Sequence, residues 1–119
     1  MIPSVYNPTL YQGDTWNLVA SVTQYIAGSY TDYDLTGYTA KSQLRRRPDA
    51  SASMFDFSCT IPVSSGCLIS MTGAPSATAL VPAGSYVWDV QISGTSGTNS
   101  GCVYTVARGM AAVVAEVTK

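Results

Sequence analysis

Hydrophobic and polar side chains alternate through most of this chain, and this period of two constrains the fold more than any other feature. Its clearest example is the stretch SYVWDVQIS, residues 85–93. Side chains of a β-strand point alternately to opposite faces, so the pattern predicts a strand with one buried face. The same alternation recurs at residues 15–22, 38–45, 55–61, 67–73 and at the start of 102–117.

Turn-forming residues separate these segments, and helical spacing is scarce. Residues 74–84, APSATALVPAG, interrupt the alternation and predict one short helical turn. A bend or bulge is expected near Gly109. A chain of 119 residues has room for one hydrophobic core. We therefore expect an all-β fold, an antiparallel immunoglobulin-like β-sandwich of seven or eight short strands, as a single domain over residues 13–119.

The first twelve residues lie outside this pattern. Pro3 and Pro8 cannot donate a hydrogen bond to a central sheet ladder, so residues 1–12 are expected to form an extended N-terminal arm. Two explanations for the arm are open. It is a loose terminus, or its side chains Val5, Tyr6 and Leu10 anchor on a neighbouring subunit.

The chain carries few charges. Charged residues make up 11% of it and the formal net charge is −1. A general nucleic-acid binder or a protein that binds anionic membranes needs a positive field, so neither partner is expected. The N-terminus lacks the pattern of a secretion signal, and no apolar run approaches the length of a membrane span. So little charge suggests that other subunits cover much of the surface.

Three of the six basic residues are contiguous, at Arg45, Arg46 and Arg47. Strand alternation separates them, because Arg45 and Arg47 point one way together with Lys41, while Arg46 points the other way. Two explanations are open: a charged strand end that discourages edge pairing, or a dock for carboxylates of a protein partner.

Catalysis, metal binding and cofactor binding are not expected. The chain has no histidine, which removes the commonest general base and a common metal ligand. Asp32 and Asp34 lie close together but in a turn-rich stretch, where Asp side chains bond to their own backbone. The three cysteines are expected to be free thiols, with a Cys59–Cys67 disulfide as the alternative.

Eight tyrosines against two phenylalanines allow three explanations. Their rings pack at the edge of the core with the hydroxyl in water, they belong to an interface, or they form a platform for sugars. The candidate platform is a cluster in one stretch, made of Tyr25, Tyr30, Tyr33 and Tyr38.

The motifs QGDTW, DLTGYTAKSQLR, GCLISMTG and LVPAGSYVWDVQIS follow one another along the chain. Together they resemble a small domain that is widespread in tailed bacteriophages, similar to the N-terminal domain of upper baseplate proteins. The resemblance runs from about Tyr11 to Val117. The matching residues are Gly13, Asp14, Thr15, Leu35, Thr36, Gly37, Tyr38, Leu44, Arg45, Leu80, Pro82, Ala83, Gly84, Tyr86 and Asp89.

This resemblance implies an immunoglobulin-like sandwich with a structural role in the virion and no catalytic residues. In baseplate proteins a long coiled or receptor-binding region follows the domain, whereas this sequence stops at Lys119. We therefore expect a capsid cement or decoration protein that packs non-covalently on the major capsid protein, forms a homo-oligomer within the assembly, and joins the virion in the host cytoplasm. The alternatives are a small tail or baseplate adaptor and a carbohydrate-binding module.

Overall fold

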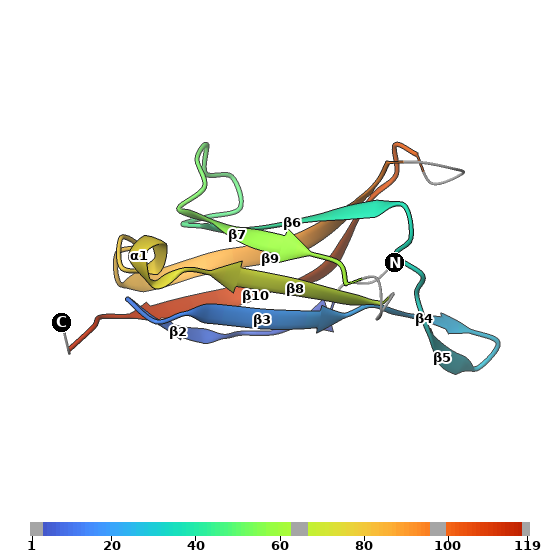
Figure 1. Cartoon of the computed structure of the whole chain (residues 1–119), viewed down its shortest axis with the longest axis horizontal. Coiled ribbons are helices and arrows are strands. Elements are labelled where there is room, and N and C mark those ends of the chain that lie inside the picture. Colours follow the sequence, from blue (N-terminus) through green and yellow to red (C-terminus); the bar gives the residue numbers. More distant parts are fainter. Residues whose placement is uncertain (1–3, 63–66, 96–99, 118–119) are drawn as a thin grey trace.

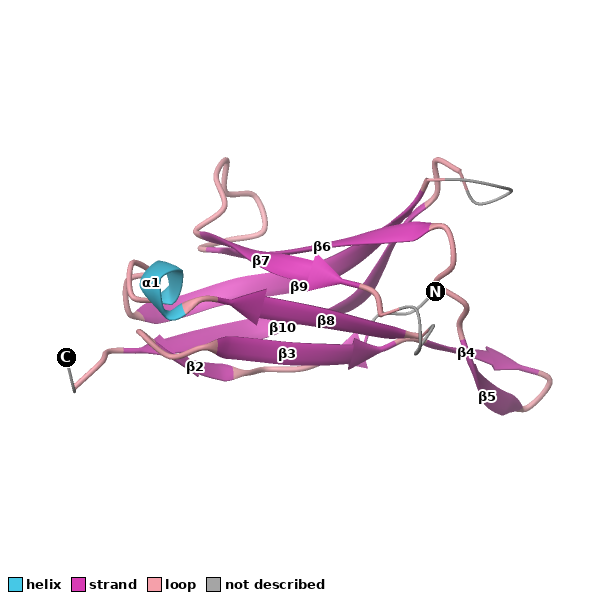
Figure 2. Ribbon diagram, viewed as in Figure 1, coloured by secondary structure: helices cyan, strands magenta, loops and turns pink. Residues whose placement is uncertain are grey.

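The computed structural model describes residues 4–62, 67–95 and 100–117, and it is built almost entirely of strands (Figures 1 and 2). The strands are β1 (Ser4–Val5), β2 (Thr9–Tyr11), β3 (Trp16–Ser21), β4 (Thr23–Ile26), β5 (Ser29–Asp32), β6 (Tyr38–Arg45), β7 (Phe55–Thr60), β8 (Leu68–Gly73), β9 (Gly84–Gly94) and β10 (Val103–Val114). The one helix described, α1 (Pro75–Thr78), occupies the stretch predicted to form a helical turn.

Eight of the strands form one sheet, in the order β1-β10-β9-β6-β7-β8-β3, with β2 also paired to β10. The sheet curls into a half-barrel. Strand β7 lies where the curl turns, because its two halves have different partners. Its first half pairs with β6, as in Leu44 opposite Phe55, and its second half pairs with β8, as in Thr60 opposite Ser70.

The all-β prediction is confirmed, but the purely antiparallel immunoglobulin-like sandwich is not. The sheet is mixed, because β1 and β2 both run parallel to β10. Residues 4–11, expected to form an arm, lie along β10 with Ser4 opposite Ala107 and Thr9 opposite Ala112. The alternation of hydrophobic and polar residues within a segment does not reveal which distant segment it pairs with. The parallel pairing of residues 4–11 with β10 could therefore not be predicted from either segment.

The predicted alternation places the core as expected. Leu44, Ile69, Val90 and Ile92 have no exposed surface and point into the curl from β6, β8 and β9. Trp16 on β3 packs edge-on against Phe55 on β7, with ring centroids 4.9 Å apart, so these aromatic residues connect two strands that are separated by β8 in the sheet order. Helix α1 is fastened to this core by the buried Thr78, whose hydroxyl donates to the carbonyl of Asp14 at 2.7 Å.

The turn-rich stretch before β6 forms a two-stranded sheet of its own. Strands β4 and β5 pair as a hairpin that extends from one end of the molecule (Figure 1). Its turn residues Ala27 and Gly28 have φ angles of 53° and 83°, the left-handed values that a tight two-residue hairpin turn requires. Within the described part of the chain, no helix has the length and apolar character needed to cross a bilayer.

The N-terminal segment lies close against β10 at Gly109. The amide of Tyr6 donates to the carbonyl of Arg108, and Asn7 supplies its side-chain oxygen to the amide of Met110 at 3.0 Å. The indole of Trp88 donates to the carbonyl of Tyr6 at 2.8 Å. A side chain on Gly109 would overlap that same carbonyl, so only glycine allows this contact.

We predict that Gly109→Ala separates residues 4–7 from β10, because the added methyl group meets backbone rather than a movable side chain. The expected loss is about 2 kcal/mol of unfolding free energy in urea, with a red shift of tryptophan fluorescence as Trp88 loses its partner. Ala112→Val, at an exposed position of the same strand, is the matched control and should be near neutral. A Gly109→Ala variant as stable as the parent would contradict the close contact.

Candidate protein interface

The three contiguous arginines point to three different surroundings. Arg45, the last residue of β6, donates to the carbonyl of Ala50 at 2.8 Å and to the side chain of Gln43 at 2.9 Å. Arg46 lies over the ring of Tyr86, 4.7 Å from its centroid. Arg47 pairs in an exposed turn with Asp49, at 3.4 Å. The three do not form one positive patch, and Arg45 alone belongs to the face of the sheet.

The candidates in the N-terminal segment also differ in their surroundings. Val5 is exposed on β1 beside β10. Tyr6 is more than half exposed, and its ring meets Trp88 edge-on with centroids 6.4 Å apart. Leu10 is 6% exposed, because it packs into the core of its own chain. Val5 and Tyr6 are therefore open to a neighbour, while the side chain of Leu10 faces inward.

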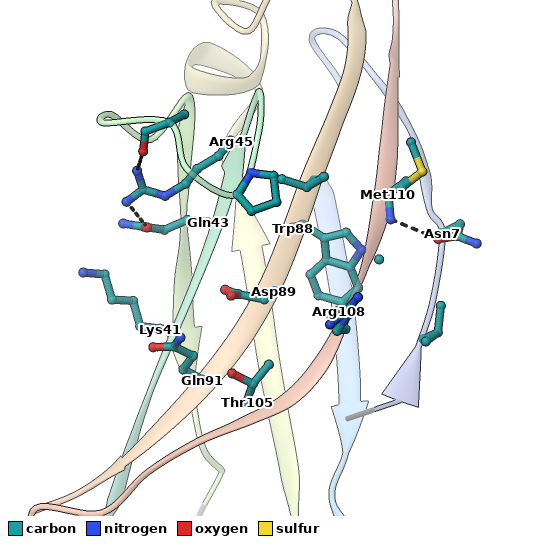
Figure 3. A pocket seen from close by; sticks show the side chains of 15 residues that line it. Asn7, Lys41, Gln43, Arg45, Trp88, Asp89, Gln91, Thr105, Arg108 and Met110 are labelled. Carbon is teal, nitrogen blue, oxygen red and sulfur yellow. Dashed lines mark hydrogen bonds between the residues drawn. The ribbon is translucent and has the colours of Figure 1, made fainter. Parts of the chain in front are cut away.

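A groove of about 970 Å³ crosses the outer face of β6, β9 and β10 (Figure 3). Strand register arranges its lining in three rows of directly opposed residues. The first row is Lys41, Gln91 and Thr105. The second is Gln43, Asp89 and Arg108. The third is Arg45, Val87 and Met110. Val5 from β1 and Pro48 from the loop after β6 complete the apolar side of the groove.

Arg108 reaches this face because of a β-bulge. The register of β10 against β9 shifts between Thr105 and Ala107, so that one extra residue, Val106, is inserted. Without the bulge Ala107 would share the outer face with Thr105, and Arg108 would point into the core. With it, Arg108 lies opposite Asp89. Bulges commonly re-aim side chains in this way.

The groove is electropositive although the chain is not. Its lining holds three cationic side chains and one carboxylate, a formal excess of two positive charges, whereas the whole chain carries −1. Half-burial raises the pKa of the Asp89 carboxyl above its ordinary value, and the charge of Arg45 partly opposes that rise. Asp89 therefore neutralises part of the positive field at the centre of the groove.

Sequence reasoning identified only part of this surface. Alternation in β6 groups Lys41, Gln43 and Arg45 on one face, and that grouping is confirmed. Alternation in β9 likewise places Asp89 on an outward position, although the strand pairing that brings it beside Arg45 is not visible in the sequence. Arg108 was missed, since its orientation depends on the bulge.

The other titratable groups of interest lie outside the groove. The hydroxyls of Tyr33 and Tyr38 are 2.8 Å apart, and this hydrogen bond raises the pKa of Tyr38 to about 12. Tyr33 is thus tied to a buried partner rather than standing free as a sugar platform. The three cysteines are free thiols, and burial raises the pKa of Cys59. Among the described residues, no His, Cys, Asp or Glu cluster is arranged to hold a metal ion.

No protein-family model and no curated protein matches this chain. One solved structure that does match is the Listeria monocytogenes internalin-like protein lmo2027, at a TM-score of 0.42 and 12% sequence identity. The match covers 94% of this chain and 28% of that protein, so the chain spans less than a third of its length. A likeness this weak assigns neither fold family nor function.

We predict that Asp89→Asn stabilises the protein at neutral pH. Folding raises the pKa of this carboxyl, so its ionised form weakens the folded state above the unfolded value of 3.8, and the penalty disappears below it. The melting temperature of Asp89→Asn should exceed that of the parent near neutral pH, and the difference should close as the pH falls through that value.

Asp34→Asn provides a control of opposite sign. Two hydrogen bonds from Thr36 lower the pKa of Asp34, so its ionised form favours folding. Asp34→Asn should therefore melt no higher than the parent at neutral pH. Circular dichroism melting curves recorded across the acid range compare the two variants. Equal pH profiles for both would contradict the assigned environments.

Proposed function

We propose that this chain is a non-catalytic structural subunit of a bacteriophage particle, bound to the capsid exterior as a cement or decoration protein. The resemblance of its motifs to the phage domain supports the virion role. The observation that carries the proposal is a set of exposed apolar side chains at one end of the molecule. A free monomer gains nothing from keeping such side chains in water, whereas a subunit of an assembly buries them against its neighbours.

This apolar end is organised around Gln12. The side chain of Gln12 donates to the carbonyl of Val81 at 2.7 Å and accepts from the amide of Glu116 at 3.2 Å. These bonds tie the loop after α1 and the C-terminal segment to the same point, and α1 and the C-terminus lie at one end in Figure 1. The exposed side chains next to these residues, here called the apolar end, are Tyr11, Leu80, Val114 and Val117. Leu80 is 81% exposed and Val117 is 95% exposed.

The finer description of the fold as immunoglobulin-like is part of the same proposal. In that fold two sets of strands each form a sheet. In one sheet the fifth strand pairs with the second and the fourth, and in the other the sixth strand pairs with the third and the seventh. If the β4–β5 hairpin is treated as an insertion, the same pairings are found here. Strand β8 pairs with β3 and β7, as in the first sheet, and β9 pairs with β6 and β10, as in the second. Pairing of β6 with β7 joins the two groups into one curled sheet.

A local contact also supports this description. Immunoglobulin-like domains carry a tyrosine near the start of the sixth strand whose hydroxyl bonds to backbone a few residues upstream. Tyr86 lies at the start of β9, and its hydroxyl donates to the carbonyl of Pro82. Tyr86 is buried, with 1% of its surface exposed. Its hydrogen bond to Pro82 therefore fixes the corner between α1 and β9.

Copy number in purified particles tests the proposal. Quantitative mass spectrometry of washed virions, from the phage whose genome encodes this chain, should find it in tens to hundreds of copies per particle. A handful of copies would instead favour the tail or baseplate adaptor, because the tail has fewer equivalent binding sites than the capsid. Absence from washed virions would exclude both.

A paired substitution then tests the apolar end. Leu80→Ser with Val117→Ser should reduce the amount of the chain retained on particles, because the exposed apolar area available to a neighbour falls. The matched control is Val19→Ser. Val19 is an exposed residue of β3 outside the apolar end, and the substitution removes a comparable side chain. Equal retention of both variants would place the binding surface elsewhere on the molecule.

A further inference from the structure

The outer-face groove holds three cations against one carboxylate, and hydrogen bonds hold one of these cations, Arg45, in place. Arg45 uses two of its guanidinium nitrogens to bind Ala50 and Gln43, which holds its side chain in one position. Among the described residues the recorded ion pair is Arg47–Asp49, so none of the groove cations has a carboxylate within 4.0 Å. A ligand that supplies carboxylates meets an arginine whose side-chain entropy is already lost.

The positions of the cations define what can bind. Lys41 and Arg45 lie on β6, four residues apart, and Arg108 lies two strands away on β10. Residues four apart along a strand are separated by about 13 Å, and two strand spacings make about 10 Å. Charges this far apart cannot all bind a single small anion. They match carboxylates spread along an extended chain.

The apolar row distinguishes a peptide from a polysaccharide or a nucleic acid. Val87 and Met110 lie opposite each other beside Arg45 and offer an aliphatic surface next to the charges. Sugars and bases are usually held by stacking on exposed aromatic rings. Trp88 is the aromatic residue that lines the groove, and it is only 5% exposed, so it provides no platform.

We propose that the groove binds an extended acidic segment of a neighbouring protein, with carboxylates at Arg45, Lys41 and Arg108 and an aliphatic side chain on Val87 and Met110. The groove residues define the chemistry of the bound segment. The proposed function enters only in the identity of the partner, which would be another virion protein. Asp89 at the centre acts as a selectivity element, because it repels a carboxylate placed midway and thereby fixes the register of the segment.

Amide chemical-shift mapping by NMR tests the groove directly. The probe is a capped peptide in which three aspartates alternate with leucines, and the comparison peptide has asparagine in place of each aspartate. The acidic peptide should produce saturable shifts at residues 41–45, 89–91 and 108, weakened by added salt. The asparagine peptide should bind at least tenfold more weakly.

Variants of the protein sharpen the test. Lys41→Ser with Arg108→Ser should weaken binding of the acidic peptide at least tenfold. Arg47→Ser, which removes the same kind of charge outside the groove, should leave it unchanged. Asp89→Asn should strengthen it about threefold, as expected from removing one like charge at roughly 7 Å in water. Dispersed amide spectra establish that each variant is folded.

Several outcomes would overturn the inference: no saturable shift at millimolar peptide, equal binding of the two peptides, or shifts located elsewhere. Inorganic phosphate, dextran sulfate or single-stranded DNA binding as tightly as the acidic peptide would show a general anion site instead. Self-association that is lost in the Lys41→Ser, Arg108→Ser variant would identify a second copy as the occupant. Peptide binding and virion content are measured separately, so failure of one leaves the other standing.

Discussion

The β-bulge between Thr105 and Ala107 determines the orientation of every later residue in β10. It turns Ala111 and Val113 into the core and Arg108 and Met110 onto the outer face. It also places Gly109 on the inner side, where the missing side chain leaves room for the N-terminal segment. The close approach of the N-terminal segment and the position of Arg108 in the groove therefore both depend on one inserted residue.

Much of the fold could be predicted because burial on one face imposes a period of two that a single sequence displays. The stretch that became β9 is the clearest case, and its inward residues Val90 and Ile92 are fully buried. The curl and the parallel edge could not be predicted, because pairing partners distant in sequence leave no local pattern. The extended segment at residues 4–11 was recognised by its prolines, but its course along β10 depends on Gly109.

The bend or bulge expected near Gly109 is present as a bulge in the same strand, but Gly109 itself has a different role. Glycine within a strand commonly marks either a bulge or a close approach of another backbone. Here the bulge occurs three residues earlier, and Gly109 serves the close approach to Tyr6. Simple alternation counted from Thr105 would place Arg108 on the inner face of the sheet. The bulge places it on the outer face instead. That is why Lys41 and Arg45 of the candidate site could be grouped from the sequence and Arg108 could not.

The two candidate surfaces have complementary physical roles in the proposed assembly. The apolar end offers area, and burial of apolar area supplies affinity without strong directional preference. The groove offers charges at positions set by the strand register, and such charges select among partners and set the register of a bound segment more than they add affinity. A cement protein needs both, since weak contacts repeated over a lattice hold it only if each copy docks in the same orientation. In a chain with six basic residues, three of them in one groove represent a concentration of charge that solubility alone does not require.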